Sequence, residues 1–179
     1  MAAGRVVFDA GPMTDDADGL DRFDAMPQDA AVEALLACCS SPQWARALAA
    51  GRPYSSVGAV LDTADTVLAG LPEAEIDRAL AGHPRIGERP HSAASAREQA
   101  GVAGAPDEVH AALAAGNRAY EQRFGYRYLV CASGRTGSEL LALLQDRLHN
   151  DVETERRVMR TELAKINRLR LRALLTAAA

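Results

Sequence analysis

The sequence predicts an all-α fold, a single-domain compact bundle of about eight helices. Alanine supplies 37 of the 179 residues and aromatic residues only eight. Alanine has the highest helix propensity of all residues and is a poor strand former. Apolar residues make up 48% of the chain and charged residues 25%, which is enough apolar material for a core and excludes a disordered chain. A chain of this length fits one domain or at most two small ones.

Periodicity and helix-end signals locate the helices in order along the chain. Residues 1–22 carry five aspartates among glycine and proline, which predicts a mobile leader, with the helical domain spanning 23–179. Several of the helices that follow begin at a proline and end at a glycine. The helices predicted are one that begins near residue 28, and then 42–50, 56–69, 73–81, 96–101, 106–124, 138–149 and 151–174.

Two segments do not read as long helices. Residues 82–95 contain two glycines, two prolines and two histidines, so they cannot form a long regular element. Residues 125–136 hold a short apolar run, 128–132, between turn residues. Periodicity leaves two alternatives open for that run, a buried extended segment and a helical turn.

Composition also excludes several classes of protein. The net charge of −4 and the pI near 5.6 argue against a nucleic-acid binder. No apolar run approaches the 18 or so residues of a membrane span, and residues 1–22 lack the apolar core of a signal peptide. The three cysteines form no disulfide framework, and the four histidines show no metal-ligand spacing. We therefore expect a soluble, cytoplasmic protein without a metal site.

His83 is the first candidate for acid–base chemistry. It stands between Gly82 and Pro84, and a residue before proline is pushed toward extended geometry. We therefore expect His83 to leave the helix end and project from a loop, as suits a group that ionises near neutral pH. The alternative is a structural role, in which the imidazole caps the last carbonyls of the preceding helix.

Ser95 and Glu98 admit two interpretations. Their S-x-x-E spacing matches a capping box, with Ser95 as the N-cap residue. The helix that would follow is poor in apolar residues, however, and a helix N-terminus presents free amides to an anion. On that second interpretation Ser95, Glu98 and Gln99 offer a hydroxyl, a carboxylate and an amide to a small polar ligand.

The last predicted helix brings an arginine into its apolar stripe. At about 100° per residue, with Ile166 at zero, Met159 falls near 20°, Leu163 near 60° and Arg170 near 40°, whereas Arg168 falls near 200°. An unpaired guanidinium on a buried face costs several kcal/mol. Arg170 therefore either has a structural role, in an internal salt bridge or with its stem buried and its charge reaching solvent, or binds an anion in a pocket.

Four stretches in order resemble the 2-oxo-4-hydroxy-4-carboxy-5-ureidoimidazoline (OHCU) decarboxylases of urate degradation. They are 83–87 (HPRIG), 95–101 (SAREQAG), 124–131 (FGYRYLVC) and 165–171 (KINRLRL). Each is weak alone, but the ordered set is specific, and the resemblance covers residues 22–174. Arg85 departs from the pattern, because many relatives have aspartate there.

The resemblance implies an all-helical, cofactor-free enzyme that converts OHCU to (S)-allantoin and carbon dioxide. Its catalytic residues would be His83 and Glu98, which share the proton transfers, and Arg170, which anchors the anion. The partner is then a small ureidoimidazoline, with neither nucleic acid nor membrane, and relatives suggest a homodimer. The implied substrate contacts are Pro84, Ser95, Gln99, Tyr128, Leu129, Val130, Cys131 and Ala132.

Two other functions remain open from the sequence. One is a helical module that binds a small molecule or a protein without catalysis, in which Ser95 and Glu98 form only a capping box. The other is a hydrolase of a related ureide, although no metal constellation is visible in the sequence to activate water.

Overall fold

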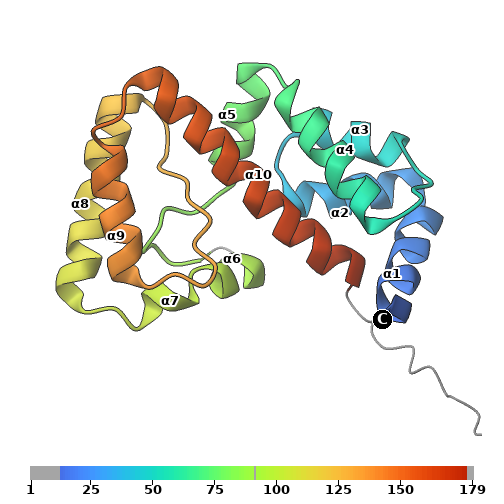
Figure 1. Ribbon diagram of the computed structural model, residues 1–179, viewed down its shortest axis with the longest axis horizontal. Helices are drawn as coiled ribbons and strands as arrows, with labels where there is room; N and C mark the ends of the chain where they lie inside the picture. The colour runs from blue at the N-terminus through green and yellow to red at the C-terminus, as the bar shows by residue number, and fades with distance from the viewer. Residues whose placement is uncertain (1–12, 91, 177–179) are drawn as a thin grey trace, which may run out of the picture.

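The computed structural model describes residues 13–90 and 92–176, which form ten helices and no strand (Figure 1). The all-α prediction is confirmed. The first five helices are α1 (Met13–Ala25), α2 (Gln28–Cys38), α3 (Pro42–Ala50), α4 (Val57–Ala69) and α5 (Glu73–Ala81). The other five are α6 (Ala93–Glu98), α7 (Ala100–Ala103), α8 (Asp107–Phe124), α9 (Gly137–Arg147) and α10 (Val152–Thr176). None of these helices is both long and apolar enough to cross a membrane.

Helix ends follow the local signals of the sequence. The Ser41 hydroxyl accepts a hydrogen bond from the Trp44 backbone N–H at the start of α3, and Pro42 occupies the first helical position. At α9, Thr136 and Glu139 form a reciprocal capping box. Such caps satisfy the free amides of a first turn, whereas α5 and α8 begin after a proline without a side-chain cap. The predicted bounds of α3, α4, α5, α8, α9 and α10 hold to within two residues.

The structure differs from the sequence prediction in two places. Residues 13–22, expected in a mobile leader, belong to α1, and residues 1–12 lie outside the described part of the chain. The helix expected over 96–101 is replaced by α6 and α7, because Ser92 rather than Ser95 is the N-cap of α6. The described residues therefore have ten helices where about eight were predicted.

Helix α10 runs between two groups of helices (Figure 1). On one side, apolar residues of α10 join α1–α5 in the larger hydrophobic cluster. On the other side, α8, α9 and the segment that follows α8 form a second cluster around Tyr120 and Tyr128. The buried Glu155 of α10 bonds Tyr120 of α8 and Arg147 of α9, so side chains at successive turns of this one helix reach different parts of the protein.

The segment 128–132 is extended. Helix α8 ends at Gly125, whose φ of 80° is left-handed and suits a residue without a Cβ. Beyond it the side chains alternate: Leu129 and Cys131 pack into the larger cluster, and Tyr128, Val130 and Ala132 into the second. A period of two is that of an extended chain, which decides between the two conformations left open by the sequence.

Candidate active site

His83 lies at the turn after α5 and points inward. Its backbone N–H donates to the carbonyl of Leu80 at 3.0 Å, while its imidazole has no hydrogen-bond partner among the described residues. His83 does leave the helix end, as expected, but its side chain turns into the protein rather than toward solvent, since the residue is only 4% exposed. The alternative of an imidazole cap on α5 is also wrong.

Burial sets the ionisation state of His83. Loss of hydration disfavours the imidazolium, and the positive charge of Arg170 disfavours it further. Together they lower the pKa of His83 from 6.5 to about 3. The free protein therefore holds a neutral imidazole here, which can accept a proton.

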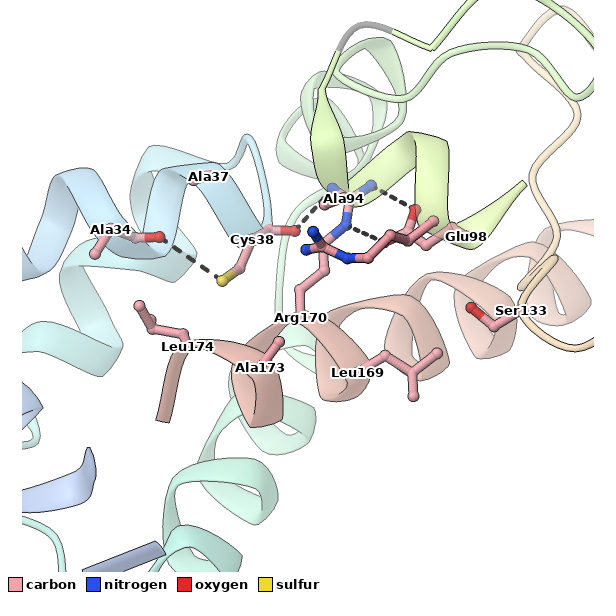
Figure 2. Close-up of a pocket in the computed structure, with 11 residues that line it drawn as sticks. Ala34, Ala37, Cys38, Ala94, Glu98, Ser133, Leu169, Arg170, Ala173 and Leu174 are labelled. Atoms are coloured by element: carbon pink, nitrogen blue, oxygen red, sulfur yellow. Dashed lines mark hydrogen bonds and ion pairs between the residues drawn. The ribbon is translucent and has the colours of Figure 1, made fainter. Parts of the chain in front are cut away.

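Glu98 and Arg170 form a two-point ion pair (Figure 2). Glu98 ends α6, and Arg170 lies in the penultimate turns of α10. Their side chains are 18% and 11% exposed, so the arginine that helical phase assigned to the apolar stripe does turn inward. The third guanidinium nitrogen of Arg170 donates to the carbonyl of Cys38 at 3.3 Å. Arg168, on the other side of α10, instead pairs with Asp65 of α4.

Two cavities meet at Glu98. The smaller, of about 20 Å³, is lined by His83, Pro84, Ile86, Glu98, Gln99, Leu129, Val130, Ala132 and Ile166. The larger, of about 390 Å³, is open to solvent and is drawn in Figure 2. It is lined by Ala34, Ala37, Cys38, Ala94, Arg97, Glu98, Ser133, Leu169, Arg170, Ala173 and Leu174. The Glu98 carboxylate and its partner Arg170 therefore stand between a small cavity that holds the His83 and Gln99 side chains and an open, mostly apolar cavity.

Most of the residues singled out from the sequence converge on these cavities. Seven of the eleven line the smaller cavity, and Arg170 lines the larger one beside Glu98. The other three, Ser95, Tyr128 and Cys131, line neither. The capping-box interpretation of Ser95 is wrong as well, since its N–H donates to the Ser92 hydroxyl at 3.1 Å and Ser95 itself lies within α6.

Gln99 braces the loop that carries His83. Its amide oxygen accepts from the N–H of Gly87 at 3.0 Å, and its amide nitrogen donates to the carbonyl of Arg85 at 3.3 Å. Arg85, the departure from the family pattern, pairs with Glu121 of α8. The loop is thereby tied to α8 on one side and to the end of α6 on the other.

Two groups of residues around the site were missed from the sequence. Ile86 and Ile166 line the smaller cavity, and only the helical phase of Ile166 had indicated a buried position. Glu162 and Arg147 bond the backbone of the segment 128–132, at Cys131 and Leu129 respectively. Glu162 falls at about −40° on the phase scale set by Ile166, so its inward position was available from the sequence, but its partner was not. Among the described residues, no three His, Cys, Asp or Glu side chains group as metal ligands would.

A family model described as OHCU decarboxylase matches residues 24–172 of this chain. A curated relative, the uric acid degradation bifunctional protein of Arabidopsis thaliana, is 27% identical over 142 residues. That alignment covers 75% of this chain and 44% of the relative, so the chain spans less than half the length of the curated relative it matches.

Two solved structures are similar to this fold. One is a crystal structure of OHCU decarboxylase in the presence of (S)-allantoin, with a TM-score of 0.72 and 26% identity, covering 79% of this chain and 96% of that one. The other is (S)-allantoin synthase, with a TM-score of 0.68 over 87% of this chain and 53% of that one. Its 17% identity speaks for the fold alone.

Proposed function

The chain belongs to the OHCU decarboxylase family, and we propose that it catalyses the cofactor-free decarboxylation of OHCU to (S)-allantoin and carbon dioxide, the last step from urate to allantoin. The observation that carries the proposal is the meeting of His83, Glu98 and the segment 128–132 around one cavity, with Arg170 held against Glu98. A neutral base, a carboxylate and a guanidinium are the groups that this reaction needs.

The substrate supplies its own electron sink. Its ring carbon bears both a hydroxyl and a carboxylate, and the neighbouring ring carbon is doubly bonded to nitrogen. When the bond to the carboxylate breaks, the electron pair moves into the C=N group and carbon dioxide leaves. The ring nitrogen, which now carries the electron pair, takes a proton from solvent water. The hydroxyl then loses its proton as the ring carbonyl forms, and the neighbouring carbon gains a proton. Addition of that proton from one face gives the S product.

The roles proposed for the three residues are those implied by the family resemblance. Neutral His83 accepts the hydroxyl proton and returns a proton to carbon, while Glu98 orients the hydroxyl or shares that transfer. Arg170 holds the substrate carboxylate, which matches the planar fork of a guanidinium. Proton transfer by placed groups contributes about a hundredfold to ten-thousandfold to rate.

Substrate binding requires the site to open. A cavity of about 20 Å³ holds about one water molecule and cannot take an imidazoline ring with its ureido and carboxylate groups. The substrate carboxylate would replace Glu98 at Arg170, and the smaller cavity would then join the larger one. The exchange of one carboxylate for another keeps the guanidinium of Arg170 paired throughout, which avoids the cost of leaving that cation buried without a partner.

The test is formation of allantoin from freshly made substrate. Urate oxidase and hydroxyisourate hydrolase generate OHCU in the cuvette, and circular dichroism follows the S enantiomer with and without this protein. We expect fast formation of the S enantiomer alone, and we expect this activity to be unchanged in excess EDTA. Racemic product at the spontaneous rate contradicts the proposal, and activity lost in EDTA and restored by zinc or manganese contradicts its cofactor-free form. Light scattering on the same sample tests the homodimer suggested by relatives.

A further inference from the structure

The backbone of the segment 128–132 is held along one edge only. The carbonyl of Leu129 accepts from Arg147 at 2.7 Å, and the N–H of Cys131 donates to Glu162 at 2.8 Å. In an extended chain the N–H and C=O of one residue point to the same edge, and those of the next residue point to the other. The bonds to Leu129 and Cys131 therefore belong to one edge, and Val130 presents its groups on the opposite edge.

The edge of Val130 is unpaired. Val130 is 4% exposed and lines the smaller cavity, yet neither its N–H nor its C=O has a partner among the described residues. Buried backbone groups are nearly always hydrogen-bonded in folded proteins. An adjacent donor and acceptor at a cavity wall match the N–H and C=O of an amide or ureido group.

Glu162 is built to hold this arrangement in place. Its side chain is 9% exposed, and its second carboxylate oxygen pairs with Lys165 at 2.6 Å. Both oxygens are thus used, one toward the backbone of Cys131 and one toward the solvent side of α10. Glu162 lies one helical turn before Ile166, which itself lines the cavity. The carboxylate thereby joins the extended segment to the helix that carries Arg170.

We infer that Glu162 is a positioning residue: by binding the N–H of Cys131 on the far edge, it aims the N–H and C=O of Val130 at an amide or ureido group of the ligand. This inference rests on the proposed function. It assigns to Glu162 no contact with substrate and no proton transfer. Its effect is on where the substrate lies, so it appears in binding more than in the chemical step.

The experiment compares three variants. Glu162→Met removes the acceptor but keeps the length and helix propensity of the side chain. Glu162→Gln keeps an acceptor oxygen for Cys131. Lys165→Met removes only the counter-ion of Glu162 and serves as the matched control. Each is measured for thermal melting, for Kd toward (S)-allantoin, and for KM and kcat with OHCU, and the amide signal of Val130 is followed by ¹⁵N NMR.

We expect (S)-allantoin to shift the Val130 amide signal in the unmodified protein. Glu162→Met raises Kd and KM about tenfold or more, since misplacement on the scale of 1 Å is costly, and it leaves kcat within a few-fold. Glu162→Gln and Lys165→Met bind nearly as the unmodified protein does. If Glu162→Met does not fold, Glu162→Asp, which is one methylene shorter, takes its place with the same expected rise in Kd.

Three results overturn the inference: a Val130 amide signal that (S)-allantoin leaves unmoved, a Glu162→Met protein that melts earlier but binds normally, and a Lys165→Met protein damaged as much as Glu162→Met. Failure of the proposed function is distinguishable. It appears as absence of turnover in the unmodified protein, whereas failure of the inference alone appears as normal turnover with an indifferent Glu162.

Discussion

The guanidinium of Arg170 and the carboxylate of Glu98 meet through two parallel hydrogen bonds, Nε to Oε1 at 2.7 Å and a terminal nitrogen to Oε2 at 2.9 Å. This pair combines both interpretations that the sequence left for Arg170, because an internal salt bridge occupies the position of an anion site. A bound carboxylate would need to form the same two bonds. In the proposed reaction Glu98 is thus both a catalytic candidate and the group that the substrate carboxylate displaces.

Arg170→Lys should lower kcat/KM by about tenfold to a hundredfold, because an ammonium cannot reproduce the planar fork and a charge-assisted bond contributes about 1.5–3 kcal/mol. Arg168→Lys is the matched control. It keeps the charge opposite Asp65 on α4 and should be nearly silent in both melting and turnover. A lower melting temperature with normal activity per folded molecule in Arg170→Lys would assign the arginine a structural role only.

Glu98→Gln should separate displacement from chemistry. The amide keeps the shape of the side chain but loses the charge that competes for Arg170, so small carboxylate inhibitors should bind at least as tightly as before. Turnover should fall by about a hundredfold or more if Glu98 takes part in proton transfer. Steady-state kinetics with an anionic inhibitor measures both quantities. Near-normal kcat would remove Glu98 from the chemistry.

Stability should fall as the pH drops below about 6.5, because the unfolded chain then binds a proton that buried His83, with its pKa of about 3, does not take up in the folded protein. Folding lowers the pKa of His83, so the loss of stability is absent above about pH 6.5, where this imidazole is neutral in both the folded and the unfolded chain. The slope is at most about 1.4 kcal/mol per pH unit. Urea unfolding between pH 6.5 and 5 measures this slope above the range where most carboxylates titrate. His83→Asn should flatten the dependence of the unfolding free energy on pH. An unchanged slope in that variant would place the proton uptake elsewhere.

Glu155→Leu should cost about 3–5 kcal/mol of unfolding free energy, because it leaves the buried charge of Arg147 without its partner. Glu155 is fully buried and accepts from Arg147, Tyr120 and Asn150. Glu73→Gln, which touches only the exposed pairs with Arg156 and Arg160, should cost less than about 1 kcal/mol. Denaturant melts of the two variants provide the comparison, and equal losses would contradict it.

Local signals predicted most helices but not the site's internal contacts. Caps and glycine stops act within one turn, so the bounds of α3 and α5 follow from their own residues. The start of α6 was misassigned because two serines three residues apart, Ser92 and Ser95, compete as N-caps, and the tertiary fold decides between them. Residues 13–22 were misassigned because their acidic composition hid the docking of α1 on α10, where a Cβ on Gly19 would lie 1.5 Å from a backbone oxygen.

For the α10 residues of the candidate site, the sequence predicts the inward position of each side chain but not its partner. Helical phase indicates that Arg170, Glu162 and Glu155 turn inward, since each falls within about 40° of Ile166. Helical phase carries no information on which residue lies opposite each of these side chains. The partners, Glu98, Cys131 and Arg147, come from elements 8 to 72 residues away, and only the packing of α10 brings them into reach.

Glu155, Glu162 and Arg170 lie on one uninterrupted helix, so the helix geometry fixes the distances and angles between them. Inserting one residue between Lys165 and Arg170 would advance the arginine by about 1.5 Å and turn it by about 100°, away from Glu98, while both glutamates keep their partners. Glu155 would then keep its bonds to Tyr120 of α8 and Arg147 of α9, whereas Arg170 would lose its bonds to Glu98. In this architecture a change in chain length within α10 is more damaging to the site than most changes of side chain.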